Sequence, residues 1–205
     1  DAARAAVDAA KAHSDGTLLV APRLEDRYAS YGVVAEIVQL GRLATGEPAA
    51  VIKAERRVRI GSGVSGPGTA LWVEAEELPE PAHETEEVTK LATEYKSLVI
   101  ATLQRRDAWQ VIDTVNRLTD PSTLADLAGY APWLSDERKR QLLETPDVTT
   151  RLTTLIEWTK AYIAETEVND KIADDVREGM EKSQREFLLR QQLNAIRKEL
   201  GEDEP

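Results

Sequence analysis

The chain has 205 residues, of which 41% are hydrophobic and 31% charged, and its formal net charge is −11. This length and composition fit one or two folded domains, and no apolar run reaches the ~20 residues that a membrane-spanning helix needs. A surface this acidic repels phosphate backbones, which makes nucleic acid a poor general partner. The chain has no cysteine, which excludes disulfides and thiolate metal sites and fits a reducing, cytoplasmic setting.

The first part of the chain, residues 1–80, is predicted to be rich in β-structure. An alanine-rich helix over residues 2–12 is followed by short apolar stretches that alternate with glycine-containing turns. These stretches follow one another without intervening helices, a pattern that indicates an antiparallel sheet or small barrel. The expected strands are 17–21, 32–40, 50–60 and 70–75.

Residues 74–87 contain seven acidic residues and two prolines, and residues 78–83 within them are predicted to separate this part from a helical bundle over residues 81–165. Within the bundle, apolar residues recur at spacings of three and four from Val88 to Leu103, the pattern of an amphipathic helix. Asp120-Pro121, Ser135 and Thr145-Pro146 are predicted helix starts.

One very long helix is predicted from residue 146 to residue 202, and residues 166–205 are interpreted as its extension beyond the bundle. A helix of roughly 55 residues would be about 80 Å long. Gly179 lowers helix propensity midway, which leaves open whether the helix is straight. Its last apolar residues form a 4-3-4 seam that fits a partner helix, although a surface helix folded back on its own domain is the alternative. The seam consists of Leu189, Leu193, Ile196 and Leu200.

No motif in the chain predicts catalysis, cofactor binding or metal binding. Residues 61–66 match G-x-G-x-x-G, but a strand follows where a dinucleotide site needs a helix, and Pro67 stands where a P-loop needs lysine. We therefore interpret this motif as a hairpin turn. His13 and His83 lie in predicted loops without the three or four converging ligands of a zinc site.

Several aromatic and apolar residues have two possible interpretations. Trp109, Trp158 and Tyr162 follow helical spacing and are expected in the core. A second group of residues is interpreted either as loop residues that cap a core or as exposed contacts for other polypeptides. These candidate contact residues are Trp133, Leu134, Tyr28 and Tyr31.

Basic residues cluster in the predicted strand 50–60. Arg57 and Arg59 are two apart and share one face of the strand, with Arg56 next to Arg57. We interpret this cluster as a solvated strand face and not as a phosphate site.

Three stretches resemble the Lon family of ATP-dependent serine proteases of bacterial type. The first two are YGVVAEI at residues 31–37 and AERRVRI at residues 54–60, and the third and most specific is residues 180–202. The resemblance implies the N-terminal substrate-recognition region of that family. The implied fold is α+β, with a small antiparallel β-barrel or sheet domain (PUA-like), a helical bundle and one very long helix. Relative to the family pattern, one or two initial strands are expected to be missing, disordered or cut away.

The resemblance also implies a function. Such a region recognises misfolded or degron-bearing proteins through weak apolar contacts, supports assembly of a homohexamer and serves protein quality control and the stress response in the cytoplasm. The AAA-plus ATP site, with its Mg²⁺, and the Ser-Lys protease dyad are expected in the full-length parent and not in this chain. Neither membrane nor nucleic acid is an expected partner. Two other interpretations stay open at this point: a stand-alone coiled-coil adaptor and a nucleic-acid-binding module.

Overall fold

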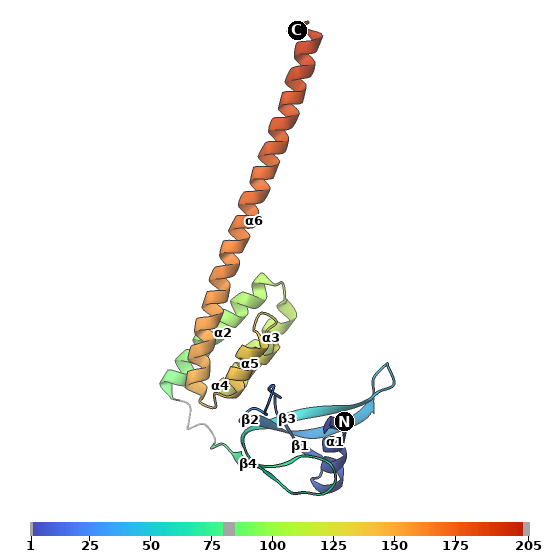
Figure 1. The fold of residues 1–205 in the computed structure, drawn as a ribbon. Helices are drawn as coiled ribbons and strands as arrows, with labels where there is room; N and C mark the ends of the chain where they lie inside the picture. The colour runs from blue at the N-terminus through green and yellow to red at the C-terminus, as the bar shows by residue number, and fades with distance from the viewer. Residues whose placement is uncertain (1, 80–84, 203–205) are drawn as a thin grey trace. The chain divides into compact units, whose positions relative to one another are not determined.

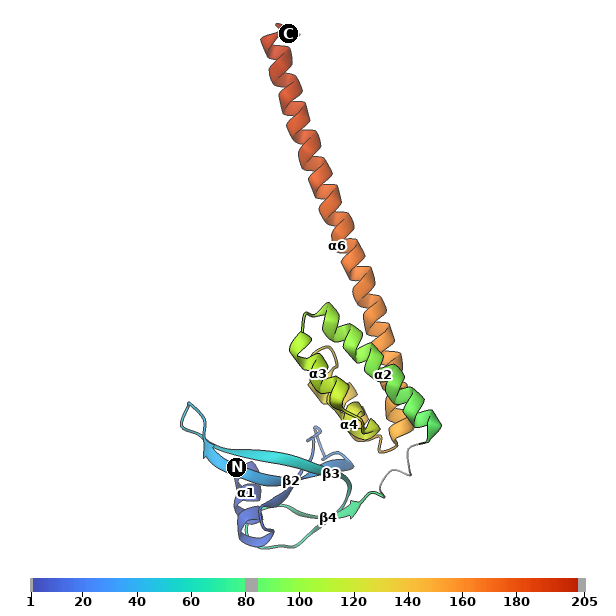
Figure 2. The same ribbon diagram turned by 180° about the vertical axis from the view of Figure 1, so that it is seen from behind.

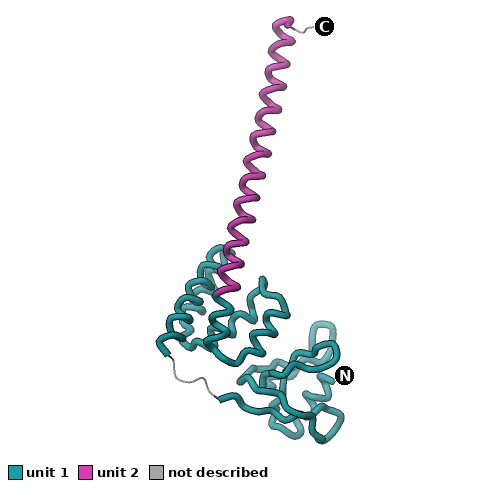
Figure 3. The backbone as a smooth tube through the Cα atoms, turned by 60° about the vertical axis from the view of Figure 1, so that its left-hand side comes forward, with its two compact units in different colours: residues 1–156 teal, residues 157–205 magenta. Residues whose placement is uncertain are grey.

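The computed structural model describes residues 2–79 and 85–202. The chain forms two compact units, residues 1–156 and residues 157–205 (Figure 3). Most of the predicted boundary at residues 78–83, including His83, lies outside the described residues. The division into three parts at residues 80 and 165 stays a prediction.

Four strands form one antiparallel sheet in the order β1-β2-β3-β4 (Figure 1). The strands are β1 (Thr17–Val20), β2 (Tyr31–Arg42), β3 (Pro48–Val64) and β4 (Trp72–Glu77). β2 and β3 form a long hairpin whose turn is closed by the Leu43 amide, which donates to the Glu47 carbonyl at 2.8 Å. Gly46 takes the positive φ of 87° that this turn requires. The predicted antiparallel sheet is confirmed.

Helix α1 (Ala2–His13) precedes the sheet and contacts β1 (Figure 2). It ends in a turn in which Gly16 has a φ of 80° and accepts a hydrogen bond from the Ile37 amide at 2.8 Å. The small core of this part consists of Ala10, Ala29, Val34, Ala35 and Val58.

The prediction of a hairpin turn at residues 61–66 is only partly right, because Ser65 and Gly66 lie in the connection from β3 to β4 and the other four residues of the motif do not. β3 continues to Val64, so the first glycines of the motif lie in a strand. Gly66 packs against the Trp72 ring so closely that a Cβ on Gly66 would overlap with the ring atoms. Trp72 Nε1 donates to the Pro67 carbonyl at 3.0 Å and fixes the ring in this place.

Helices follow from residue 86 onward and bury one continuous apolar core. α4 and α5 begin at the predicted caps, since Asp120 accepts from the Thr123 amide at 2.7 Å and Ser135 accepts from the Arg138 amide at 3.2 Å. The helices are α2 (Glu86–Arg105), α3 (Trp109–Arg117), α4 (Pro121–Asp126), the 3₁₀ turn η1 (Leu127–Tyr130), α5 (Asp136–Leu143) and α6 (Val148–Glu199).

The prediction that Trp109 belongs to the core is wrong. Its side chain is 58% exposed, whereas Val115 on the same helix is buried. Six residues advance an α-helix by about 240°, so the two side chains cannot share a face. Trp158 and Tyr162 are half-buried.

The predicted long helix is confirmed as α6, which runs without interruption from Val148 to Glu199 and passes through Gly179. It begins two residues after the predicted start. Asp147 caps it by accepting from the Thr150 amide at 2.8 Å and the Thr150 hydroxyl at 2.6 Å, and these bonds hold the pKa of Asp147 below its usual value.

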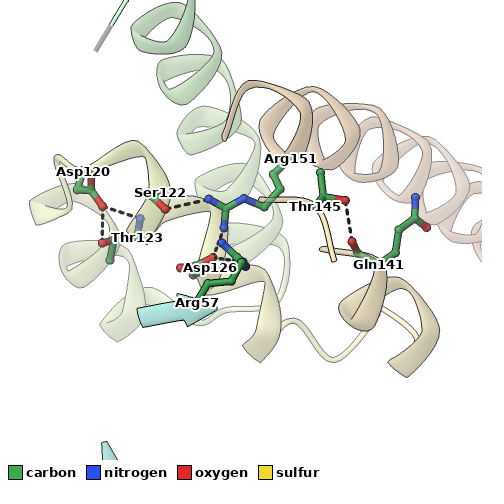
Figure 4. A network of polar contacts seen from close by, with 8 residues as sticks. All are labelled: Arg57, Asp120, Ser122, Thr123, Asp126, Gln141, Thr145 and Arg151. Atoms are coloured by element: carbon green, nitrogen blue, oxygen red, sulfur yellow. Dashed lines mark hydrogen bonds and ion pairs between the residues drawn. The ribbon is translucent and has the colours of Figure 1, made fainter. Parts of the chain in front are cut away.

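A buried guanidinium connects the start of α6 to α4 and β3 (Figure 4). Arg151 is 1% exposed; its Nη1 lies 2.5 Å from Asp126 Oδ1, and its Nη2 donates to Ser122 Oγ at 2.9 Å. Arg57 Nη2, from β3, approaches the same Asp126 oxygen at 3.4 Å. Burial, and next the charge of Arg57, lower the pKa of Arg151. The Asp126 carboxylate therefore lies close to the positive charges of both Arg151 and Arg57.

Replacing Asp126 by Asn is expected to lower the free energy of unfolding by about 2–3 kcal/mol, because the buried Arg151 loses its paired carboxylate and keeps only the charge of Asp147 nearby. Arg151→Met removes the buried charge itself and should lower the free energy of unfolding by only about 1 kcal/mol. Urea unfolding followed by tryptophan fluorescence measures both. The exposed Asp174, paired with Arg177 at 2.8 Å, gives the control variant Asp174→Asn, with an expected change below about 0.5 kcal/mol. Equal effects of the two Asp→Asn variants would contradict the role of Asp126.

Gly66→Ala is expected to displace the Trp72 ring and break its hydrogen bond to Pro67, at a cost of about 1–3 kcal/mol. Gly63→Ala is the matched control, because a Cβ there meets only the Trp72 carbonyl oxygen at 3.8 Å. Thermal unfolding should show a lower midpoint for the Gly66 variant alone. The same midpoint in both variants would refute the packing argument.

Candidate functional site

The outer half of the β2–β3 hairpin carries exposed aliphatic side chains on both of its faces, which together we call the hairpin surface. Their exposed fractions lie between 41% and 61%; a single exposed aliphatic residue is ordinary, whereas five within one hairpin are not. The hairpin surface consists of Val38, Leu40, Leu43, Val51 and Ile52.

A β-bulge and the length of the strands place these residues outside the core. In the first half of β2, Gly32, Val34 and Ala35 are buried, whereas every residue from Val38 to Arg42 is exposed. Ile37 pairs with Ile52 and Gln39 pairs with Val51, so Val38 is an extra residue on β2. The hairpin thus extends past the core and exposes aliphatic side chains.

A shallow groove lies at the base of the hairpin surface, where α1 meets β2. It is lined by Lys11, Gly16, Ile37, Val38, Gln39 and Leu40. Ile37 is half-buried and continues the apolar surface inward. Three aliphatic side chains of β2 thus line the groove together with the Lys11 ammonium group and the Gln39 amide.

The structure separates the four candidate contact residues proposed from the sequence. Tyr28 is 43% exposed and bridges to Arg23 in the loop before β2. Tyr31 is half-buried at the first position of β2, with the Arg59 guanidinium 5.8 Å from its ring centroid. Trp133 is half-buried between η1 and α5, and Leu134 is only 4% exposed. Leu134 therefore packs in the helical core. The side chains of Tyr28, Tyr31 and Trp133 are at least partly exposed.

None of these three residues belongs to the hairpin surface. Tyr31 and Val38 are seven residues apart on one strand, about 23 Å at the rise of a β-strand. Contact between clients and Tyr28, Tyr31 or Trp133 stays a prediction.

The arginines of β3 are engaged by acidic side chains. Arg56 Nε lies 2.9 Å from Glu77, and Arg59 Nη1 lies 3.4 Å from Glu76, both on β4. Arg57 contacts Asp126. Because acidic groups already neutralise this cluster, it is a poor site for phosphate.

Within residues 2–79 and 85–202, no group of three or more histidine, aspartate or glutamate side chains is arranged to hold a metal ion. In the same ranges, no helix is long and apolar enough to cross a membrane.

Sequence reasoning missed the hairpin surface, although a signal was present. A strand with one solvent face alternates apolar and polar residues, but Ala50, Val51 and Ile52 are consecutive apolar residues, and Ile37 and Val38 are adjacent. Both faces of the hairpin are therefore apolar at its outer half, which requires either a cover or a binding partner.

A family model described as the ATP-dependent protease La (LON) substrate-binding domain matches residues 1–161. The Lon protease of Mycolicibacterium smegmatis is 67% identical over 202 residues, which cover 98% of this chain and 26% of that protein. The Lon protease of Salinispora arenicola is 60% identical over the same shares, and that of Escherichia coli K12 is 32% identical over 96% of this chain. The chain spans about a quarter of the length of these relatives.

Solved structures agree with these matches. The N-terminal domain of a Mycobacterium avium complex Lon protease is 62% identical, with a TM-score of 0.74 over 78% of this chain and 86% of that chain. A Lon N-terminal domain protein from Xanthomonas campestris, at 19% identity and a TM-score of 0.51 over 74% of this chain and 79% of that one, shares the fold. The family model, the related proteins and the solved structures each match most of this chain. The chain therefore belongs to the family of Lon N-terminal substrate-binding domains.

Proposed function

We propose that this chain binds apolar segments of misfolded or degron-bearing polypeptides through the hairpin surface, on behalf of an ATP-dependent Lon protease. The observation that carries the proposal is a group of exposed aliphatic side chains on both strands of a hairpin, in a member of a substrate-binding family. Unfolded proteins expose such apolar segments, whereas folded proteins bury them.

The hairpin surface supports weak and tolerant binding. Its aliphatic side chains offer area without directed hydrogen bonds, and the groove beside α1 adds a polar margin with Lys11 and Gln39. Partial burial of a few such side chains supplies only a few kcal/mol. Weak sites gain strength when several copies act together, which is the advantage of a hexameric parent.

The parent is proposed to be a cytoplasmic homohexamer with a role in protein quality control and the stress response. Its ATP and Mg²⁺ site and its Ser-Lys protease dyad belong to AAA-plus and protease modules outside this chain. In that assembly the chain contributes recognition, and Tyr28, Tyr31 and Trp133 are secondary contacts for clients.

A nucleic-acid-binding role has less support. The net charge of −11 opposes it, and the arginines of β3 are paired with acidic residues. Absence of retention on heparin at low salt is the result that our proposal expects.

The proposal is tested with a permanently unfolded polypeptide, reduced and carboxymethylated α-lactalbumin, carrying a fluorescent label. Val38→Ser with Val51→Ser should weaken binding about tenfold, because two aliphatic contacts lose part of their apolar area. Fluorescence anisotropy measures the dissociation constant, and circular dichroism verifies that the variant keeps its fold.

Tyr130→Ser is the matched control. Tyr130 is 87% exposed on η1, so its loss removes a large exposed apolar side chain outside the hairpin surface. This variant should bind as the unchanged chain does. Unchanged binding by the Val38/Val51 variant, or equal weakening in both variants, would overturn the proposal.

A further inference from the structure

The outer half of β2 has no neighbouring strand on the side that faces away from β3. β1 pairs only with residues 33–36 of β2, and next to these the Ile37 amide donates to the Gly16 carbonyl at 2.8 Å. Gly16 takes a positive φ of 80° and connects β1 to α1 at this point. In the part of the chain that the structure describes, residues 38–42 therefore form a free strand edge beyond the end of β1 (Figure 1).

The register of the hairpin shows which backbone groups lie on this free edge. In an antiparallel pair, residues that bond to the partner strand alternate with residues whose N–H and C=O point away from it. The Leu43 amide donates across the hairpin at the turn. Counting back from Leu43, Gly41 also points toward β3, whereas Arg42 and Leu40 point away from it. This agrees with the pairing of Arg42 opposite Pro48, which has no N–H to donate.

Leu40 and Arg42 thus each present one N–H and one C=O at the free edge. Both residues are exposed, and within the described residues no strand lies beside them on that side. The chemical complement of such an edge is an extended polypeptide backbone, whose own N–H and C=O groups recur at the same spacing. A nucleic acid or a lipid has no such repeat. The edge therefore fits a polypeptide segment in the β conformation.

The corresponding edge of β3 is less suited to pairing. β4 pairs only with residues 58–64 of β3, so residues 48–57 are also free on that side. This stretch contains Pro48 and four charged residues, and proline and charge are features that keep strand edges from pairing. By contrast, Arg42 is the only charged residue in the sequence from 38 to 42. The four charged residues of β3 are Lys53, Glu55, Arg56 and Arg57.

The shallow groove at the base of the hairpin lies beside the free edge of β2. Ile37, Val38 and Leu40 line this groove together with Lys11 of α1. A strand paired at Leu40 would project alternate side chains to the same face, next to these aliphatic groups. The groove therefore gives the bound segment a preference for apolar residues at alternate positions.

We propose that an unfolded client adds an extended strand to the free edge of β2, with backbone hydrogen bonds to Leu40 and Arg42. This inference rests on the proposed client-binding function of the hairpin surface, and it names the form in which the client binds. The bound segment continues the line of β1 and carries apolar residues at alternate positions. Folded proteins use their backbone groups in their own helices and sheets, so the edge selects unfolded chains.

Residue-resolved hydrogen exchange by NMR tests the pairing, with reduced and carboxymethylated α-lactalbumin as the client. At saturation, the amides of Leu40 and Arg42 should exchange at least about tenfold more slowly than in the free chain, because they become hydrogen-bonded. The Gly41 amide is the internal control. It is already bonded to Ala49 of β3, so its exchange should change much less.

The outcomes separate this inference from the proposed function. Unchanged exchange of Leu40 and Arg42, with the client bound by fluorescence anisotropy, would overturn the strand pairing and leave client binding by the hairpin surface in place. No client binding by anisotropy would overturn both. Slow exchange of these two amides in the free chain that depends on its concentration would assign the edge to a second copy of this chain, which also contradicts the inference.

Proline at position 42 tests the same bond from the protein side. Arg42→Pro removes the outward N–H and leaves the bonds between β2 and β3 intact, because Arg42 donates none of them. The matched variant Arg42→Ala loses the same side chain, with its 2.8 Å bond to the Gly46 carbonyl, but keeps the N–H. Arg42→Pro should bind the client about fivefold more weakly than Arg42→Ala. Equal dissociation constants, in variants whose NMR spectra show an intact hairpin, would rule out the pairing.

Discussion

The contact between Asp126 and the buried Arg151 is the constraint on which the first unit depends. Arg151 lies one turn into α6 on the face that also buries Leu152 and Leu155, so its charge is held inside the protein. A buried guanidinium keeps its proton, and the protein must therefore supply a carboxylate at that place. Asp126 does so from the end of α4 and also approaches Arg57 of β3. Side chains from the sheet (Arg57) and from the start of the long helix (Arg151) thus contact the same oxygen atom of Asp126, at the end of α4.

Two groups of apolar side chains lie outside this network and are not part of the protein core. The hairpin surface extends past the core of the sheet, and the seam of α6 has no cover among the described residues. Both are made of aliphatic residues, most of them within strands or a helix, which hold the side chains in place without burying them. The hairpin surface is aliphatic, which suits varied polypeptides.

Local signals predicted most of the architecture, and long-range contacts supplied the rest. The caps Asp120 and Ser135 and the seam of α6 act within one or two helical turns, so their consequences are readable from the sequence. The pair of Asp126 and Arg151 joins residues 25 positions apart, which no periodicity reveals. Arg151 did leave a trace, because it stands on the apolar stripe between Val148 and Leu155.

The candidate site was harder to predict than the fold. The sequence pointed to aromatic and apolar residues in loops as candidate contacts. The exposure of a loop residue depends on the side chains that pack against it after folding, and Leu134 packs in the helical core. The hairpin surface is aliphatic and lies in strands, where apolar residues ordinarily indicate a core. In the structure the end of burial midway along β2 distinguishes it, and in the sequence the consecutive apolar residues 50–52 do.

The central claim is that clients contact the outer half of the β2–β3 hairpin, and hydrogen–deuterium exchange tests it most directly. Backbone amides are followed by mass spectrometry with and without a saturating unfolded polypeptide. The account predicts slower exchange in peptides that cover residues 37–52, with little change in α2, α3 and α5. Protection confined to those helices, or no protection in the hairpin at saturation, would contradict it.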